Sequence, residues 1–290
     1  AMTWNLADGS YPGLTGMPGA PSCAGYDNCW TGAVDSLWAT AGNWSAGHAP
    51  IGAESVKIDV AGTPTIALAG INPSFGSLWL AENLDVDAGV TFTLSNLFTL
   101  TAGTATFDGT ATMQGYAQTG GTLAGFGNFT VTDNYLQSGG SINGFLHMMV
   151  TQASGPLNYG ATQVGSATLN AAAIVLGPFS GGLRITTDSL QITAPVTVAG
   201  VMTLYPKTHS AIRLGSAAAN TLSLLQSDLD NLTVGEAQFF APTLMVDNGA
   251  NTVTLANFDT VQLGSQVSID SPLALTQPGS TLFLNATRID

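Results

Sequence analysis

A 19-residue internal repeat is the feature that most restricts what this chain can fold into. Over residues 120–155 the sequence reads GGTLAGFGNFTVTDNYLQS and then GGSINGFLHMMVTQASG, and the two lines can be laid on each other. The matching residues are Gly121 and Gly140, Gly125 and Gly144, Phe126 and Phe145, Val131 and Val150, and Thr132 and Thr151. A fixed period near 20 residues is typical of stacked-coil proteins, because one such unit cannot bury its apolar face alone.

Short strand patterns fill most of the remaining chain. Runs such as SVKIDV, TFTLS, TATFDG and NTVTLANFDTVQLG combine alternating apolar residues with Gly, Asn, Asp or Pro at their ends. Without amphipathic helices between them, such strands indicate either a parallel β-helix or a β-sandwich, and the repeat favours the β-helix. We therefore predict an all-β, right-handed parallel β-helix over residues 51–290, with about 12 coils of about 20 residues each.

Residues 1–50 differ from the repeats and are predicted to form an irregular, tryptophan-rich N-terminal cap. They contain four of the five tryptophans, namely Trp4, Trp30, Trp38 and Trp44. Large rings suit the open end of a solenoid, where strand edges and interior side chains would otherwise meet water. The far end carries no comparable segment, which indicates either a fragment of a longer protein or an end that meets another subunit.

Both cysteines lie in this N-terminal segment. Cys23 and Cys29 enclose a short loop, and we predict a disulfide that stabilises the fold by about 2–3 kcal/mol. A zinc site is the less favoured alternative, because the three histidines (His48, His147 and His209) do not have the required spacing. A disulfide points to an oxidising compartment, so we predict an extracellular or outer-surface location.

Charge excludes several classes of partner. The chain has only 5 Lys and Arg against 18 Asp and Glu, for a net charge of −13. Without a basic cluster we expect no nucleic-acid binding and no attraction to an anionic membrane. No apolar run is long enough for a membrane-spanning helix. We expect no cofactor, with weakly held Ca²⁺ as the one ion the acidic residues suit. Asp85 and Asp87 come closest to a site, although a solvated coil edge explains them better.

One local pattern departs from strands. In LLQSDLDNLTVG, Ser227 is predicted to be the N-cap of a single helical turn, with Asp228 and Asp230 in its first turn and Gly235 as its stop.

Several stretches resemble a known group of proteins. Residues 30–60, WTGAVDSLWATAGNWSAGHAPIGAESVKIDV, resemble the opening of many bacterial surface β-helices, and GGTLAGFGNFTV resembles the glycine-rich coils of autotransporter passengers. AIRLGSAAANTLSLLQSDLDNLTVG, followed by NTVTLANFDTVQLG, resembles repeats of filamentous-haemagglutinin-like proteins. The resemblance covers about half of the chain. It implies a secreted or surface-displayed right-handed β-helix used for adhesion, matrix contact or display, and it implies no catalytic residues.

We therefore expect a non-enzymatic structural or adhesive protein. Its expected partners are a host-surface or matrix glycan or protein, or further copies of itself joined end to end into an extracellular filament. Uncapped coil ends would template such strand pairing.

The main alternative is a polysaccharide lyase or glycosidase on the same scaffold. Glycoside hydrolysis needs two carboxylates about 5–9.5 Å apart. Asp85 with Asp108 and Asp247 with Asp270 are the candidate pairs, and Arg184 and Arg213 are isolated candidates for the cationic base of a lyase.

Ice binding is the third hypothesis, because Thr-x-Thr pairs recur along the chain. The pairs begin at Thr63, Thr91, Thr104, Thr130 and Thr252. The spacings between these pairs do not follow one coil period, which argues against a regular threonine array.

Overall fold

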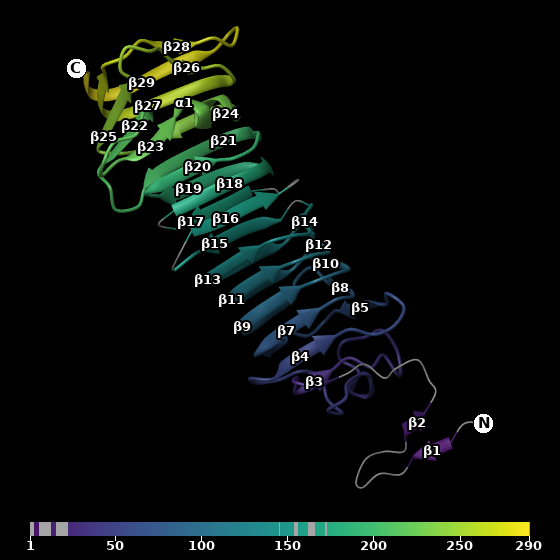
Figure 1. Ribbon diagram of the computed structural model, residues 1–290. Coiled ribbons are helices and arrows are strands. Elements are labelled where there is room, and N and C mark those ends of the chain that lie inside the picture. Colours follow the sequence, from purple (N-terminus) through teal and green to yellow (C-terminus); the bar gives the residue numbers. More distant parts are fainter. Residues whose placement is uncertain are drawn as a thin grey trace.

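The computed structural model shows an elongated stack of parallel β-strands (Figure 1). It describes residues 3–5, 13–15, 23–144, 146–153, 156–161, 166–171 and 173–289. The fold is all-β with 3% helix, and its parallel sheets stack as a β-solenoid of about 11 turns. The predicted β-helix is thus confirmed, with about one turn fewer than expected.

The strands form one long stack and one shorter sheet on another side of the coils. The long stack comprises β3 (Asn28–Cys29), β4 (Ser55–Ile58), β6 (Ser74–Phe75), β7 (Ser77–Leu80), β9 (Thr91–Leu100), β11 (Thr110–Gln118), β13 (Asn128–Gln137), β15 (His147–Thr151), β16 (Pro156–Ala161), β17 (Ser166–Asn170), β18 (Ala173–Ser180), β19 (Gly182–Thr187), β20 (Ser189–Ile192), β21 (Val196–Pro206), β22 (Ala211–Gly215), β23 (Leu222–Leu225), β24 (Leu232–Phe239), β25 (Thr243–Asp247), β27 (Phe258–Ile269) and β29 (Thr281–Ile289). The shorter sheet comprises β5 (Thr65–Leu68), β8 (Asn83–Val86), β10 (Thr104–Phe107), β12 (Thr122–Ala124) and β14 (Ser141–Ile142). A separate parallel pair is β26 (Val253–Leu255) with β28 (Leu273–Leu275).

The 19-residue repeat is the step from one coil to the next. Val131 of β13 lies directly beside Val150 of β15, as the aligned sequences predict, and both are buried. Phe145 of the aligned set lies outside the described residues. In β10, for example, buried and partly exposed residues alternate, because successive side chains of a strand point to opposite faces. In β11 the register shifts between Met113 and Gly115, an irregularity of the kind that bends a strand.

Glycine is required where coils turn a corner in close contact. Gly121 and Gly140 adopt φ of +66° and +73°, which residues with a Cβ rarely adopt. A Cβ on Gly140 would lie 2.5 Å from the carbonyl oxygen of Gly120 in the coil below. The aligned glycines of the repeat are therefore fixed by backbone conformation and by stacking.

Aromatic rings form a continuous column inside the N-terminal part of the solenoid. Neighbouring ring centroids lie 4.8–6.4 Å apart. The column contains Trp30, Trp44, Trp38, Phe75, Phe92, Phe107, Phe98, Phe129, Tyr116, Tyr135, Tyr159 and Phe179. Each ring contributes large buried area, and tilted or edge-on contacts add to the stability.

The α-helix found within the described residues differs in its ends from the sequence prediction. α1 (Gln226–Asp230) begins before Ser227, and a carboxylate oxygen of Asp228 accepts the Leu225 backbone N–H at 2.9 Å. The other Asp228 oxygen accepts the Ile192 N–H at 2.9 Å, so this buried carboxylate joins two coils. The helix ends at Asp230 with Asn231 as its C-cap, and Gly235 lies inside β24 instead of stopping the helix. The predicted N-cap and stop residues are therefore wrong.

A second carboxylate holds a corner of the C-terminal half. Asp188 accepts hydrogen bonds from the backbone N–H groups of Lys207, Thr208 and His209 and from the Thr208 hydroxyl. Burial alone raises the pKa of Asp188, but these hydrogen bonds and the nearby His209 ring outweigh it and lower the pKa to about 2.

The N-terminal segment is only partly described. β1 (Thr3–Asn5) and β2 (Gly13–Thr15) pair antiparallel within a stretch predicted to be irregular, and a short 3₁₀ helix, η1, covers Ala41–Asn43. Trp30, Trp38 and Trp44 are buried, whereas the side chain of Trp4 lies outside the described residues. The boundary at residue 50 and the interpretation as a cap stay predictions.

Within the described residues, no helix has the length and apolar character needed to cross a membrane.

Candidate binding surfaces

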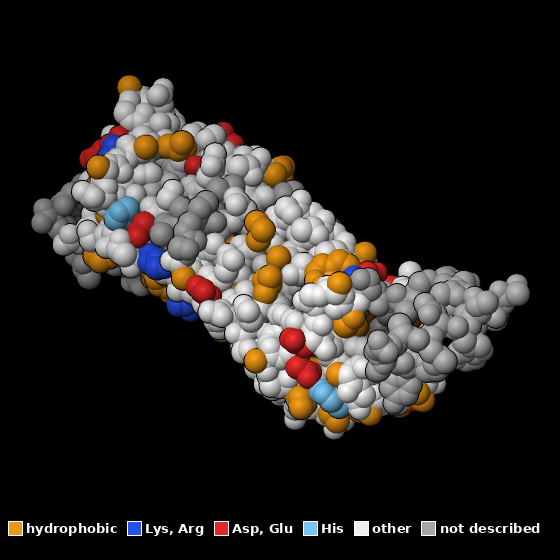
Figure 2. All heavy atoms as spheres, turned by 60° about the horizontal axis from the view of Figure 1, so that its bottom comes forward, with side chains coloured by type: hydrophobic (Ala, Val, Ile, Leu, Met, Phe, Trp, Pro, Cys, Tyr) orange, Lys and Arg blue, Asp and Glu red, His pale blue; other side chains and the backbone are white. Residues whose placement is uncertain are grey.

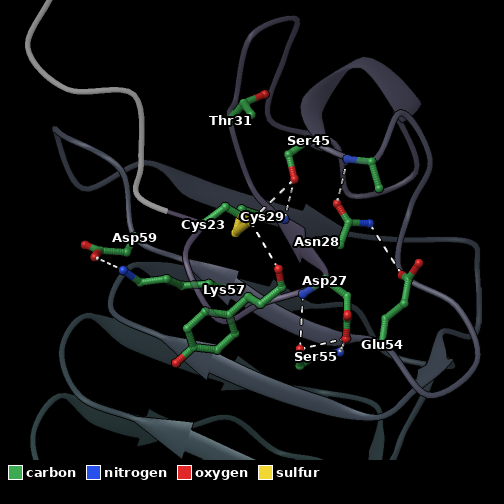
Figure 3. The surroundings of a disulfide bond; sticks show 12 residues. Cys23, Asp27, Asn28, Cys29, Thr31, Ser45, Glu54, Ser55, Lys57 and Asp59 are labelled. Carbon is green, nitrogen blue, oxygen red and sulfur yellow. Dashed lines mark hydrogen bonds and ion pairs between the residues drawn. A yellow bond between two sulfur atoms is a disulfide. The ribbon is translucent and has the colours of Figure 1, made fainter. Parts of the chain in front are cut away.

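The Cys23–Cys29 loop lies against the first coils of the solenoid. The two sulfur atoms are at bonding distance, the Cα atoms are 5.8 Å apart, and Cys29 is part of β3 (Figure 3). The Tyr26 N–H donates to the Cys23 carbonyl at 3.1 Å, which closes a turn inside the loop. The Asp27 carboxylate accepts from the Ser55 N–H and hydroxyl, both at 2.8 Å, and these bonds lower the Asp27 pKa. The loop is thereby fixed to β4.

A groove of about 230 Å³ opens beside this loop. Two adjacent strands, β7 and β9, form its floor, and Tyr26 contributes from the disulfide loop. The lining residues are Tyr26, Ser77, Leu78, Trp79, Asn96, Leu97 and Thr99. The groove therefore combines two aromatic rings with hydroxyl and amide groups on a rigid sheet.

Register explains why these residues meet. Lys57, Trp79 and Thr99 form one outward column, because each is the direct neighbour of the next on β4, β7 and β9. The Lys57 ammonium lies 5.0 Å from the centroid of the Trp79 ring, in cation–π range, and 2.9 Å from an Asp59 carboxylate oxygen. The Lys57 charge is thus compensated beside the groove.

A ladder of uncharged side chains, all but one of them polar, runs along the outside of the long stack. Each member is the direct register partner of the next on successive coils. The ladder, called the threonine ladder below, consists of Ser74, Thr93, Thr112, Thr130, Met149 and Thr168. Much of the face drawn in Figure 2 is likewise neither charged nor hydrophobic. Neighbouring strands lie about 4.8 Å apart, so the ladder presents groups at a regular spacing.

This ladder corrects the spacing argument made from the sequence. Thr91 and Thr93 lie directly beside Thr110 and Thr112, and Thr112 lies beside Thr130. Thr110 and Thr112 also form a Thr-x-Thr pair, and this pair supplies the 19-residue coil step from Thr91 and Thr93. A regular threonine array therefore does exist on three successive coils, before Met149 interrupts it.

The first candidate carboxylate pair lies on the shorter sheet. Asp85 is exposed on β8, and its register partner on β10 is Thr106, two residues before Asp108. Partial desolvation, followed by the charges of Asp87 and Asp108, raises the Asp85 pKa. Asp108 also accepts the Phe126 N–H at 3.0 Å, as a residue at a coil corner. The three carboxylates therefore interact through charge across neighbouring coils.

The second candidate pair is engaged in structural contacts. Asp247 forms a close ion pair with Arg213, and Asp270 accepts from the Ser268 hydroxyl at 3.2 Å. Arg184 lies with its guanidinium carbon 4.8 Å from the centroid of the Tyr205 ring. Each candidate cation of a lyase thus has a structural partner of its own.

Metal-ligating residues do not gather in the part of the chain that the structure describes. No group of three or more His, Cys, Asp or Glu side chains there is arranged to hold a metal ion. Asp85 and Asp87 remain a pair of carboxylates, and the expectation of weakly held Ca²⁺ stays a prediction.

Comparison of the chain with protein-family models, with curated proteins and with solved structures finds no match. The fold agrees with the β-helix that the resemblance implies. The finer resemblance to filamentous-haemagglutinin-like proteins and autotransporter passengers stays a prediction.

Proposed function

We propose that this chain is a non-enzymatic adhesive or structural rod, displayed outside the cell or on its outer surface. The observation that carries the proposal is the threonine ladder. It presents uncharged side chains on six successive coils, with hydroxyl groups on five of them. A regular, uncharged hydroxyl face can hydrogen-bond to a neutral matrix without the repulsion that a net charge of −13 imposes on anionic partners.

The disulfide supports the proposed location. A bonded cysteine pair persists in oxidising surroundings, as found outside the cell.

A binding assay on immobilised matrix proteins and insoluble neutral polysaccharides tests the proposal. Thr112→Glu places a charge in the middle of the ladder and should weaken adhesion. Thr104→Glu is the matched control, because Thr104 is also a partly buried strand threonine but belongs to the shorter sheet. Absence of adhesion to every such surface, or an equal loss in both variants, would argue against the ladder as the adhesive face.

Self-association is a second part of the proposal. β29 pairs with β27, and Phe283 and Leu284 of β29 are 53% and 41% exposed. A strand with exposed apolar side chains favours contact with another copy. Sedimentation over a range of concentrations, with negative-stain imaging, distinguishes single rods from filaments, and a monomer at all concentrations would contradict this part.

The alternative is a polysaccharide-degrading enzyme, and the raised pKa of Asp85 is the observation that favours it. Release of reducing sugar or unsaturated product from a polysaccharide panel, abolished by Asp85→Asn, would replace our proposal.

Ice binding is favoured by the stacked threonines at 91, 93, 110 and 112, and a thermal-hysteresis measurement tests it.

A further inference from the structure

The groove beside the disulfide loop has the composition of a small polar-ligand site. Its aromatic rings are Tyr26 and Trp79, and hydrogen-bonding groups come from Ser77, Asn96 and Thr99. Ligand sites in proteins typically combine apolar and aromatic walls with a few placed polar groups. The volume of about 230 Å³ lies below the range of about 300–1,000 Å³ that is usual for drug-sized ligands, which restricts the occupant to a small ring.

The chemistry of these residues fits one face of a sugar ring. A pyranose has C–H bonds on its ring faces and hydroxyl groups around its rim. An indole face accommodates the C–H groups, while a carboxamide such as that of Asn96 supplies both donors and an acceptor. Ser77 and Thr99 add hydroxyl groups that donate or accept as required.

Charge then selects among sugars. The lining contains no Asp, Glu, Lys, Arg or His, and the ammonium of the neighbouring Lys57 lies 2.9 Å from an Asp59 carboxylate oxygen. The whole chain carries −13, so a uronic or sulfated sugar would be repelled on approach, and no Lys or Arg belongs to the groove lining to receive it. A neutral sugar meets no such penalty.

The groove is also held in shape. Its floor consists of paired strands, and Tyr26 belongs to the loop that the Cys23–Cys29 bond closes. The hydrogen bonds between Asp27 and Ser55 fix the residue next to Tyr26 to β4. Preorganisation of this kind lowers the entropy cost of binding.

Resting on the adhesive function proposed above, we propose that this groove binds a single pyranose unit of a neutral polysaccharide. The ring lies against Trp79 and Tyr26, and its hydroxyl groups bond to Ser77, Asn96 and Thr99. The site thus gives the rod a specific glycan contact in addition to the extended threonine ladder.

Titration calorimetry and binding to printed glycans test the site. The probes are neutral oligosaccharides (glucan, mannan, xylan and galactan fragments) and, in parallel, the anionic hyaluronan and alginate. We expect at least one neutral series to bind, and Trp79→Ala to weaken it by about tenfold or more. Trp79→Tyr should retain part of the affinity, because it keeps an aromatic face.

Tyr205→Ala is the matched control variant. Tyr205 is also a partly exposed aromatic residue with a cation over its ring, here Arg184, but it lies in the C-terminal half and stacks on Phe240 at 5.3 Å. It should bind the neutral series like the unmodified protein, and circular dichroism verifies that each variant is folded.

Three results would overturn the site. They are binding of anionic glycans only, full affinity in a folded Trp79→Ala variant, and a greater loss in Tyr205→Ala than in Trp79→Ala. Adhesion that persists through the threonine ladder in these cases would leave the proposed function standing. If Thr112→Glu loses adhesion but keeps its affinity for the oligosaccharides, the threonine ladder and the groove act independently.

Discussion

The two halves of the solenoid reach the same architecture by different means. In the N-terminal half successive coils keep a nearly constant length, as in the 19-residue steps from Thr91 to Thr110 and from Asn128 to His147. In the C-terminal half Met202 pairs with Ala237, because two strands and α1 are inserted between them. Regular coils thus give way to coils of unequal length.

The two halves also differ in the contacts that stabilise their interior and their corners. The aromatic column and the tightly stacked glycines stabilise the regular half through shape. In the other half, individual carboxylates such as Asp188 and Asp228 hold corners through several backbone hydrogen bonds. A repeated coil is stabilised by copies of one contact, whereas an irregular coil needs contacts of its own.

The largest expected effect comes from a charge in the repeated interior. Val131→Asp buries a carboxylate between Met113 and Val150, so we expect a loss of about 4 kcal/mol or more and disruption of neighbouring coils. Thr130→Asp, on the outward face of the same strand, is the control and should change stability by less than about 1 kcal/mol. Denaturant unfolding followed by circular dichroism measures both, and similar losses would refute the buried ladder.

The corner glycines offer a direct comparison of the halves. Gly140→Ala should cost about 3 kcal/mol, because the added Cβ meets backbone oxygens of the neighbouring coil as well as an unfavourable φ of +73°. Gly249→Ala has a similar φ of +63° but no atom within 4 Å of the added Cβ, so about 1 kcal/mol is expected. Thermal unfolding of the two variants measures the difference, and equal costs would mean that stacking does not select the repeated glycines.

Loss of the disulfide should affect the N-terminal half alone. Replacing both Cys23 and Cys29 by Ser removes a constraint on the unfolded chain, with an expected loss of about 2–3 kcal/mol. Hydrogen exchange resolved by peptide should show faster exchange in β3 and β4 and unchanged exchange beyond β19. A uniform increase along the chain would instead indicate that the halves unfold as one cooperative unit.

The smallest predicted effect depends on pH. The folded-state pKa of Asp188 is lowered to about 2 from an ordinary value of 3.8, so its stabilising effect is complete above the ordinary value and is lost as the pH falls through 2. Asp188→Asn should therefore cost about 2 kcal/mol at neutral pH. The difference in the free energy of unfolding between this variant and the unmodified protein should shrink towards zero near pH 2. A constant difference between pH 2 and pH 7 would show that ionisation of Asp188 does not matter.

The sequence predicts the regular half well and the irregular half poorly, for a physical reason. Val131 and Val150 align in sequence because they stack in space, so periodicity reveals them. The contact between Asp228 and Ile192 joins residues 36 positions apart and occurs once, so no sequence pattern predicts it. The ends of α1 were mispredicted for the same reason.

The same distinction, between features that a sequence pattern reveals and features that it does not, applies to the candidate surfaces. Cys23 and Cys29 were predicted as partners because only two cysteines exist. The groove was missed because Tyr26 and Trp79 meet only through the register of β3, β4 and β7, which the coil length near the N-terminus sets. The threonine ladder was missed because Thr110 and Thr112 did not enter the comparison of Thr-x-Thr pairs, although the repeat length would have placed them beside Thr91 and Thr93.

The position of the tryptophans has a practical consequence for following how this rod comes apart. All five lie within the first 79 residues, and Trp30, Trp38 and Trp44 are buried at that end. Intrinsic fluorescence therefore reports on one terminus, while far-ultraviolet ellipticity averages over every coil. In a stack where each coil contacts only its neighbours, the two signals need not change together during unfolding. The difference between their unfolding midpoints then measures how far local unfolding at one end extends along the molecule.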